Sequence, residues 1–182
     1  MNYNRQLLIE KYPDPPSIPF LFFWGHQPSA DGSITQSCLS QWWPAPFEVD
    51  GIAYPTAEHW MMAGKARLFS DEAACRAILA CSTPAEVKEQ GRLVKNFDPV
   101  VWDKHKYEIV VRGNAHKFYG HRPLMEYLLS TGNQVLVEAS PTDKVWGIGM
   151  GAMDKDARNP AEWKGENLLG FALMEIRYNF CF

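Results

Sequence analysis

The distribution of apolar and polar residues predicts a β-hairpin followed directly by a helix. Residues 47–49 and 52–54 have the composition of two short strands, and Asp50-Gly51 between them favours a two-residue turn. A helix is expected from Thr56 onward, because a threonine oxygen can accept a hydrogen bond from the first unpaired amides of a helix. The proline before Thr56 resists helical geometry and marks this boundary.

The same kind of pattern predicts most of the remaining elements. Short strands are expected at 20–24 and 135–139, and helices over 71–81, 84–94, 102–118 and 124–130, with a last helix that Asn167 opens. Thr83 and Glu86 have the spacing of a capping box, which supports the second of these helices. This order fits an α+β fold better than regular alternation of strands and helices. We therefore expect a single compact, helix-rich domain around a small β-sheet.

The N-terminal segment differs from the rest of the chain. Residues 1–19 are polar and contain Pro13, Pro15, Pro16 and Pro19. This composition favours an extended, proline-rich arm rather than a helix. The predicted organisation is an arm over 1–19 and a domain over 20–182.

Two charged residues lie on one side of the helix predicted after Thr56. Glu58 and Lys65 are seven residues apart, which corresponds to about 700° of rotation and a rise of roughly 10 Å, so their side chains fall almost in one line. A separate apolar stripe is the predicted core face, with Glu58 and Lys65 at its border; it consists of Ala57, Met61, Gly64 and Leu68. One interpretation is structural: Glu58 is stabilised by its place at the start of the helix, and Lys65 is solvated. The other is that both side chains belong to a functional site.

Composition narrows the classes of function. The formal charge of −3 argues against a broad basic surface for duplex nucleic acid. The chain lacks both an apolar run that could span a bilayer and the core of a signal peptide, so we expect a cytoplasmic protein without a membrane partner. Its seven tryptophans suit a large core or a pocket that stacks against flat rings.

Neither a metal site nor a cofactor is expected. The four cysteines lack paired C-x-x-C spacing, and no H-E-x-x-H motif occurs. Residues 147–152 match the loose glycine pattern of dinucleotide-binding loops, but they do not directly follow a strand, and Pro160 argues against a long helix after them. These glycines can still shape a wall for a sugar or a phosphate.

Several separated segments together resemble one family. They are residues 39–65, L-V-E-A-S at 136–140, D-K-V-W-G-I-G at 143–149, G-E-N-L-L-G at 165–170 and L-M-E-I-R at 173–177. In this order they resemble the NADAR family, the YbiA-like N-glycosidases, over about residues 20–178. Gln41-Trp42-Trp43 departs from the family pattern, where an asparagine and smaller aromatics are expected. The proline-rich arm also lies outside it.

The resemblance implies cleavage of a carbon–nitrogen bond between ribose and a base. The substrates it implies are phosphoribosylated pyrimidine intermediates of riboflavin synthesis, or ADP-ribose attached to guanine in nucleic acid. Breaking such a bond develops positive charge on the sugar carbon and negative charge on the base, so a carboxylate and a proton donor are needed on opposite sides of it.

The resemblance also assigns candidate catalytic residues. Glu58 is the first candidate for the carboxylate, which would position water or stabilise the sugar cation. Lys65 would either remain cationic and contact phosphate or the base, or become neutral and attack the sugar carbon to form an imine. Asp143 is the third candidate, as a contact for ribose or water. Sequence alone leaves the choice for Lys65 open.

Substrate-binding candidates follow from the same motifs. Trp43 and Trp146 would either stack against the base or serve as buried anchors. Arg92, near a predicted helix end, would either receive phosphate or form a surface salt bridge. Gly147 would form part of the wall, and Asn167 would act first as a helix cap and secondly as a ligand contact. We expect Glu58, Lys65, Asp143 and Trp146 to line one cleft.

Three functional hypotheses remain. The leading one is an N-glycosidase that acts on a small, ribosylated and phosphorylated partner. The nearest rival removes ADP-ribose from modified guanine, with nucleic acid as its partner. A third is a noncatalytic module that senses ADP-ribose or a related nucleotide.

Overall fold

The computed structural model describes residues 3–12, 14 and 17–180 of the chain. Within these residues the fold is α+β and rich in helix, with seven α-helices and two two-stranded sheets. This confirms the predicted fold class. The contacts divide the chain into two compact units, which are described separately: unit 1 comprises residues 1–40 and 122–182, and unit 2 comprises residues 41–121.

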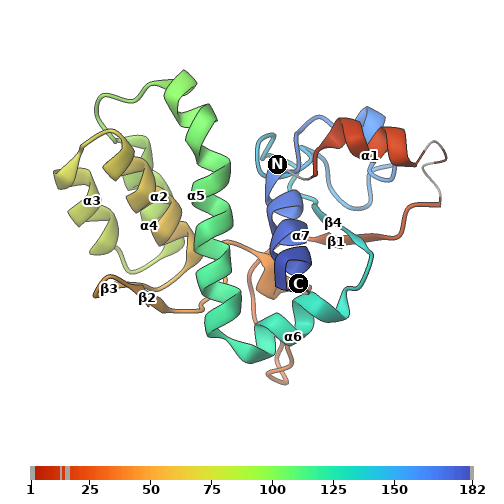
Figure 1. Ribbon diagram of the computed structural model, residues 1–182, viewed down its shortest axis with the longest axis horizontal. Helices are drawn as coiled ribbons and strands as arrows, with labels where there is room; N and C mark the ends of the chain where they lie inside the picture. Colours follow the sequence, from red (N-terminus) through yellow and green to blue (C-terminus); the bar gives the residue numbers. More distant parts are fainter. Residues whose placement is uncertain (1–2, 13, 15–16, 181–182) are drawn as a thin grey trace. The chain divides into compact units, whose positions relative to one another are not determined.

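Unit 1 is organised around two parallel strands. Strand β1 pairs with β4, so that Phe20 lies opposite Val135 and Phe23 lies opposite Glu138. Helix α7 packs along β4, as Figure 1 shows. The elements of unit 1 are α1 (Arg5–Lys11), β1 (Phe20–Phe23), η2 (Gln36–Leu39), α6 (Arg122–Ser130), β4 (Val135–Glu138), η3 (Pro160–Glu162) and α7 (Leu168–Phe180). Both strands and both longer helices lie where the sequence predicts them.

Helix α7 is buried over most of its length. Leu169, Phe171, Leu173 and Ile176 are each at most 1% exposed, which is typical of a helix enclosed on several sides. Gly170 lies directly against the Leu136 carbonyl, where a side chain would collide with the strand. The absence of a side chain at this position therefore allows α7 to approach β4 closely.

The N-terminal segment is helical over Arg5–Lys11, which contradicts the predicted extended arm. The Asn4 side chain caps this helix by accepting a hydrogen bond from the Leu7 amide, and Leu8 is buried. The guanidinium of Arg5 donates to the Pro160 carbonyl at 2.6 Å, which anchors α1 next to η3. The prolines all follow this segment, so they do not interrupt the helix; those at 13, 15 and 16 lie outside the described residues.

Unit 2 begins with the predicted hairpin. Strands β2 (Phe47–Val49) and β3 (Ile52–Tyr54) pair antiparallel. Asp50 and Gly51 have φ values of 52° and 73°, and two consecutive left-handed residues are what a two-residue hairpin turn requires. The hairpin prediction is confirmed.

Four helices complete unit 2, and α2 is the one that the others enclose. They are α2 (Ala57–Leu68), α3 (Glu72–Leu79), α4 (Pro84–Arg92) and α5 (Pro99–Gly120), with the predicted capping box of Thr83 and Glu86 present at the start of α4. Figure 1 shows α2, α3 and α4 gathered beside α5. Because three helices pack on α2, its buried surface is wider than the predicted stripe: Glu58, His59 and Ala63 are also buried.

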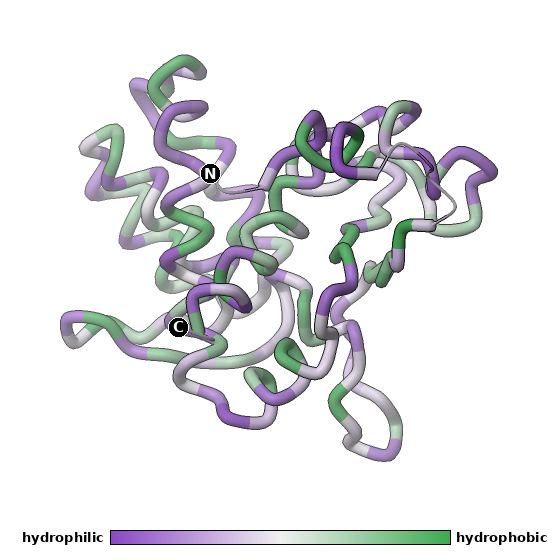
Figure 2. The backbone as a smooth tube through the Cα atoms, turned by 45° about the vertical axis from the view of Figure 1, so that its right-hand side comes forward, coloured by the Kyte–Doolittle hydropathy of each residue, from purple (hydrophilic) through white to green (hydrophobic). Residues whose placement is uncertain are grey.

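None of the helices in the described part of the chain is both long and apolar enough to cross a membrane. Figure 2 shows that hydrophobic segments of the backbone are short and repeatedly interrupted by hydrophilic ones.

Candidate active site

Glu58 lies in the first turn of α2, directly after the helix cap. The Thr56 side chain accepts a hydrogen bond from the His59 amide and so closes the start of the helix. Glu58 is only 3% exposed, although the sequence placed it at the border of the buried face. The start of a helix favours a carboxylate, and the electrostatic interactions of a carboxylate are stronger where water is excluded. Glu58 therefore has the environment that a charge-stabilising carboxylate needs.

A buried pair of carboxamides lies next to Glu58 in unit 2. The Glu58 amide donates to the main-chain carbonyl of Gln41 at 3.1 Å, and the Gln41 side-chain oxygen accepts from Asn114 Nδ2 at 2.6 Å. Asn114 Nδ2 also donates to the Val110 carbonyl within α5. Glu58 and Asn114 are thus connected through one residue.

Asn114 Oδ1 is the unusual atom of this pair. Asn114 is fully buried, and among the described residues its Oδ1 has no hydrogen-bond partner. A buried acceptor without a donor is costly, so such an atom marks a position suited to a water molecule or to a donor group of a ligand. Sequence reasoning missed Asn114. The signal that could have found it is a polar residue between Val110 and Phe118 on the buried face of α5.

His59 stabilises the start of α2 through hydrogen bonds of its ring. Its Nε2 lies 3.2 Å from the Cys81 carbonyl, which can only accept, so Nε2 carries the proton and Nδ1 accepts from the Thr56 hydroxyl at 2.9 Å. Burial lowers the pKa of His59 from its ordinary value. The neutral ring therefore fixes the cap that precedes Glu58.

Lys65 is directed toward the end of α4. Its Nζ donates to the Gly91 carbonyl at 2.7 Å and lies 4.3 Å from the centre of the Phe97 ring and 5.9 Å from that of Trp102. The carbonyl and the ring faces favour the ammonium form. Burial lowers the pKa of Lys65 from its ordinary value and opposes them. Lys65 is therefore anchored by contacts that suit a cation.

Arg92 directly follows Gly91, whose carbonyl accepts the hydrogen bond from Lys65. It is the last residue of α4 and is exposed. No hydrogen bond or ion pair within the described chain engages its guanidinium, whereas Lys65 has the contacts given above. The two cations therefore lie next to the same helix end.

Trp43 is 6% exposed, so most of its ring is covered. The neighbouring Trp42 is half-buried, and Lys88 Nζ lies 5.9 Å from the centre of its ring. Stacking of Trp43 on a base stays a prediction.

In unit 1, Asp143 organises the loop that follows β4. Its Oδ1 accepts from the amides of Val145 at 2.9 Å and Trp146 at 2.8 Å, and its main-chain carbonyl accepts from Gly149. Asp143 and Trp146 are both half-buried. The carboxylate therefore has a structural role in addition to the chemical role predicted for it.

Gly147 and Asn167 connect this loop to β4 and α7. The Gly147 carbonyl accepts from the Asn167 amide, and a Cβ atom at Gly147 would lie 2.7 Å from the Glu138 carbonyl oxygen. The Asn167 side chain accepts from the Glu138 amide and donates to the Leu136 carbonyl, both at 2.9 Å. Helix α7 begins directly after Asn167, as predicted, but the carboxamide bonds β4 instead of capping the helix.

The eight candidate residues divide equally between the units. Unit 2 holds Glu58, Lys65, Trp43 and Arg92, and unit 1 holds Asp143, Trp146, Gly147 and Asn167. Their common cleft stays a prediction.

The described residues contain no group of three or more His, Cys, Asp or Glu side chains that could hold a metal ion. Cys38, Cys75 and Cys81 do not form disulfides.

Curated relatives give the class of protein. The chain is 44% identical over 163 residues to the N-glycosidase R617 of Acanthamoeba polyphaga mimivirus, covering 87% of this chain and 94% of that protein. It is 34% identical to the N-glycosidase Npun_R5314 of Nostoc punctiforme, covering 77% and 83%, and 34% identical to the N-glycosidase YbiA of Escherichia coli, covering 72% and 74%. These relatives support the assignment of this chain as an N-glycosyl hydrolase.

The fold and the family agree with this class. The NMR structure of the E. coli protein YbiA superposes with a TM-score of 0.71 at 28% identity, covering 90% of this chain and 86% of that one. The NADAR domain model matches residues 22–180, so it extends through both units. The chain belongs to the NADAR family.

Proposed function

We propose that this protein hydrolyses the bond between ribose and a base in a small phosphorylated substrate, of the kind represented by the ribosylated pyrimidine intermediates of riboflavin synthesis. The observation that carries the proposal is the burial of Glu58, which is 3% exposed at the start of α2 and joined through Gln41 to the unpaired Asn114 oxygen. The formal charge of −3 favours a small substrate over nucleic acid.

In the proposed reaction, the carbon–nitrogen bond breaks and its electron pair leaves with the base. Glu58 stabilises the positive charge on the sugar carbon and accepts a proton from the attacking water, whose oxygen becomes bonded to that carbon. The base takes up a proton from solvent and Glu58 later releases to solvent the proton it accepted, so the products are a free sugar hydroxyl and the neutral base, and the carboxylate is restored. Asn114 Oδ1 is suited to accept a hydrogen bond from the substrate or from this water.

Lys65 is proposed to act as a cation. Its contact with the Gly91 carbonyl and two aromatic faces stabilises an ammonium, and Arg92 lies next to the same helix end. Together these two side chains would receive the phosphate of the substrate. The imine route would instead require the Lys65 amine to leave this carbonyl and lose its proton.

The residues of unit 1 are proposed to contact the ribose and the base. Asp143 keeps one oxygen available after its Oδ1 has accepted two loop amides, which suits a ribose hydroxyl. Trp146 is half-buried, so part of its ring is open to a base.

The test is an incubation of the purified protein with the ribosylated pyrimidine and, separately, with an ADP-ribosylated guanine oligonucleotide. Released sugar and base are followed by mass spectrometry. Glu58→Gln is compared with Glu72→Gln, because Glu72 is also a first-turn glutamate but its side chain is 86% exposed. We expect cleavage of the pyrimidine substrate, a loss of about 100-fold or more in Glu58→Gln and little change in Glu72→Gln.

Cleavage of the oligonucleotide alone would replace the proposed substrate with ADP-ribosylated guanine, and binding would then weaken steeply with salt. Unchanged turnover in Glu58→Gln would contradict the assigned carboxylate. Trapping with borohydride separates the two roles of Lys65: a stable adduct that disappears in Lys65→Met would support the imine route and overturn the cationic one.

A further inference from the structure

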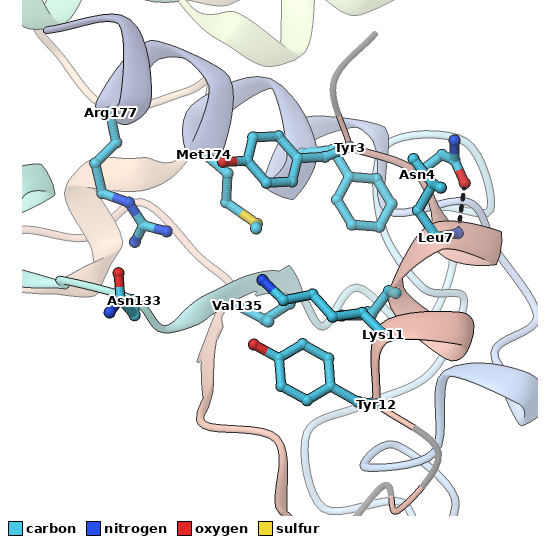
Figure 3. Close-up of a pocket in the computed structure, with 11 residues that line it drawn as sticks. Tyr3, Asn4, Leu7, Lys11, Tyr12, Asn133, Val135, Met174 and Arg177 are labelled. Atoms are coloured by element: carbon cyan, nitrogen blue, oxygen red, sulfur yellow. Dashed lines mark hydrogen bonds between the residues drawn. The ribbon is translucent and has the colours of Figure 1, made fainter. Parts of the chain in front are cut away.

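Unit 1 contains a cavity that none of the candidate active-site residues lines. It has a volume of about 410 Å³, which lies within the range of small-molecule sites. Figure 3 shows it between α1, the start of β4 and α7. Its lining residues are Tyr3, Asn4, Leu7, Leu8, Lys11, Tyr12, Asn133, Val135, Phe171, Met174 and Arg177.

This cavity is separate from the loop that carries Asp143. It lies at the Val135 end of β4, whereas the loop follows the Glu138 end. Along α7, the lining residues extend from Phe171 to Arg177, and Arg177 is nine residues beyond Leu168, which corresponds to roughly 13 Å of helix. A ligand in the cavity would therefore occupy a second site in unit 1.

The charge of the lining favours an anion. Lys11 and Arg177 are the charged residues among those that line the cavity, and no carboxylate occurs in this set. Arg177 is 8% exposed, and its guanidinium is fixed by hydrogen bonds to Thr131 Oγ1 and the Gln134 carbonyl. Figure 3 shows Lys11 extending from α1 toward Val135. A fixed guanidinium and an adjustable ammonium are well suited to a phosphate group.

The remaining lining favours a flat, partly apolar ligand. Tyr3 and Tyr12 contribute aromatic rings, and Phe171 and Met174 of α7 also line the cavity. Tyrosine rings and a methionine sulfur adapt well to an aromatic group. Lys11 Nζ lies 5.4 Å from the centre of the Tyr12 ring, so the cation and the aromatic face lie next to each other.

We propose that this cavity is an accessory binding site for an aromatic phosphate of the nucleoside monophosphate class. Six of its eleven lining residues precede residue 22, where the match to the family domain begins. Helix α1, which the sequence did not predict, and the residues on either side of it therefore supply more than half of the lining. The site is an addition to the NADAR domain and is independent of the proposed reaction.

The experiment titrates the full chain, labelled with ¹³C at the methionine methyl groups, with adenosine monophosphate. Met174 lines the cavity, and its resonance is assigned with Met174→Leu. We expect a saturable shift of this resonance, with adenosine alone and inorganic phosphate alone each binding at least about tenfold more weakly, since each lacks one half of the recognition. Lys11→Glu should lower the affinity for adenosine monophosphate by about tenfold or more.

Lys155→Glu is the matched control, because it makes the same change of charge in a side chain that is 91% exposed and does not line the cavity. Tyr12→Leu should lower the affinity for adenosine monophosphate and leave the binding of inorganic phosphate unchanged. The proposal is overturned if the Met174 resonance does not move at millimolar adenosine monophosphate, if Lys11→Glu binds as tightly as the unmodified chain, or if phosphate alone binds as tightly as the nucleotide.

Discussion

Replacement of Asn167 by alanine is expected to destabilise the protein more than any other single change to the candidate residues of unit 1. The side chain is fully buried, and its carboxamide accepts from the Glu138 amide and donates to the Leu136 carbonyl, both at 2.9 Å. Alanine removes both hydrogen bonds at once. It also places a Cβ-bearing residue without a local polar group at a φ of 56°.

The expected loss can be estimated from these three terms. A buried backbone group that loses its partner costs about 1–3 kcal/mol, so two such groups cost about 2–6 kcal/mol. The left-handed backbone adds roughly 1 kcal/mol for alanine relative to asparagine. The sum is a large fraction of the 5–15 kcal/mol or so by which domains are usually stable.

Asn96→Ala provides the control for the backbone term. Asn96 has the same φ of 56°, but it is exposed. Urea unfolding followed by far-ultraviolet circular dichroism gives the free energy of unfolding for both variants. The difference between them isolates the two hydrogen bonds of Asn167. If Asn167→Ala loses no more stability than Asn96→Ala, the carboxamide does not hold β4 as described and the reasoning is refuted.

Three further predictions concern the same parts of the molecule. Gly147→Ala should cost about 1–3 kcal/mol, because its Cβ would lie 2.7 Å from a carbonyl oxygen, whereas Gly151→Ala, whose Cβ would meet nothing closer than 3.8 Å, should be nearly neutral in urea unfolding. Asp143→Asn keeps the acceptor for the loop amides and should unfold like the unmodified chain while losing glycosidase turnover; equal turnover would exclude a chemical role for this carboxylate. Because burial lowers the pKa of His59, the unfolded state binds the proton more readily, so stability should fall as pH decreases below about 6.5, by at most about 1.4 kcal/mol per pH unit. His59→Gln should remove this dependence, and an unchanged slope in that variant would assign the effect to other groups.

Local patterns were enough to predict the elements whose signals are contained in neighbouring residues. The Asp50-Gly51 turn, the Thr56 cap and the capping box at the start of α4 are confirmed, because each depends on side chains within three residues of one another. The start of α7 directly after Asn167 is also confirmed, although the Asn167 carboxamide bonds β4 and does not cap the helix. Helix α1 was missed because nearby prolines dominated the composition, although Leu8 finds a buried position through contacts far away in the chain.

Features that depend on distant contacts could not be predicted. The burial of Glu58 follows from the packing of three helices on α2, and a helical projection of α2 alone contains no information about its neighbours. The link between Gln41 and Asn114 joins residues 73 positions apart. The direction of Lys65 toward Gly91 likewise depends on the turn of the chain between α2 and α4.

The polar candidates of unit 1 also differ in which of their side-chain atoms remain available to bind a substrate. Asn167 is fully buried, and both ends of its carboxamide are hydrogen-bonded to β4. Its contribution is to hold the strand and also the loop, because its main-chain amide donates a hydrogen bond to the Gly147 carbonyl. Asp143 places both of its loop hydrogen bonds on Oδ1 and is half-buried, and among the described residues its Oδ2 has no hydrogen-bond partner. A carboxylate divided in this way can fix the loop and bind a ribose hydroxyl at the same time. Of the two residues, Asp143 is therefore the one whose charge should affect turnover, and Asn167 the one whose loss should affect stability.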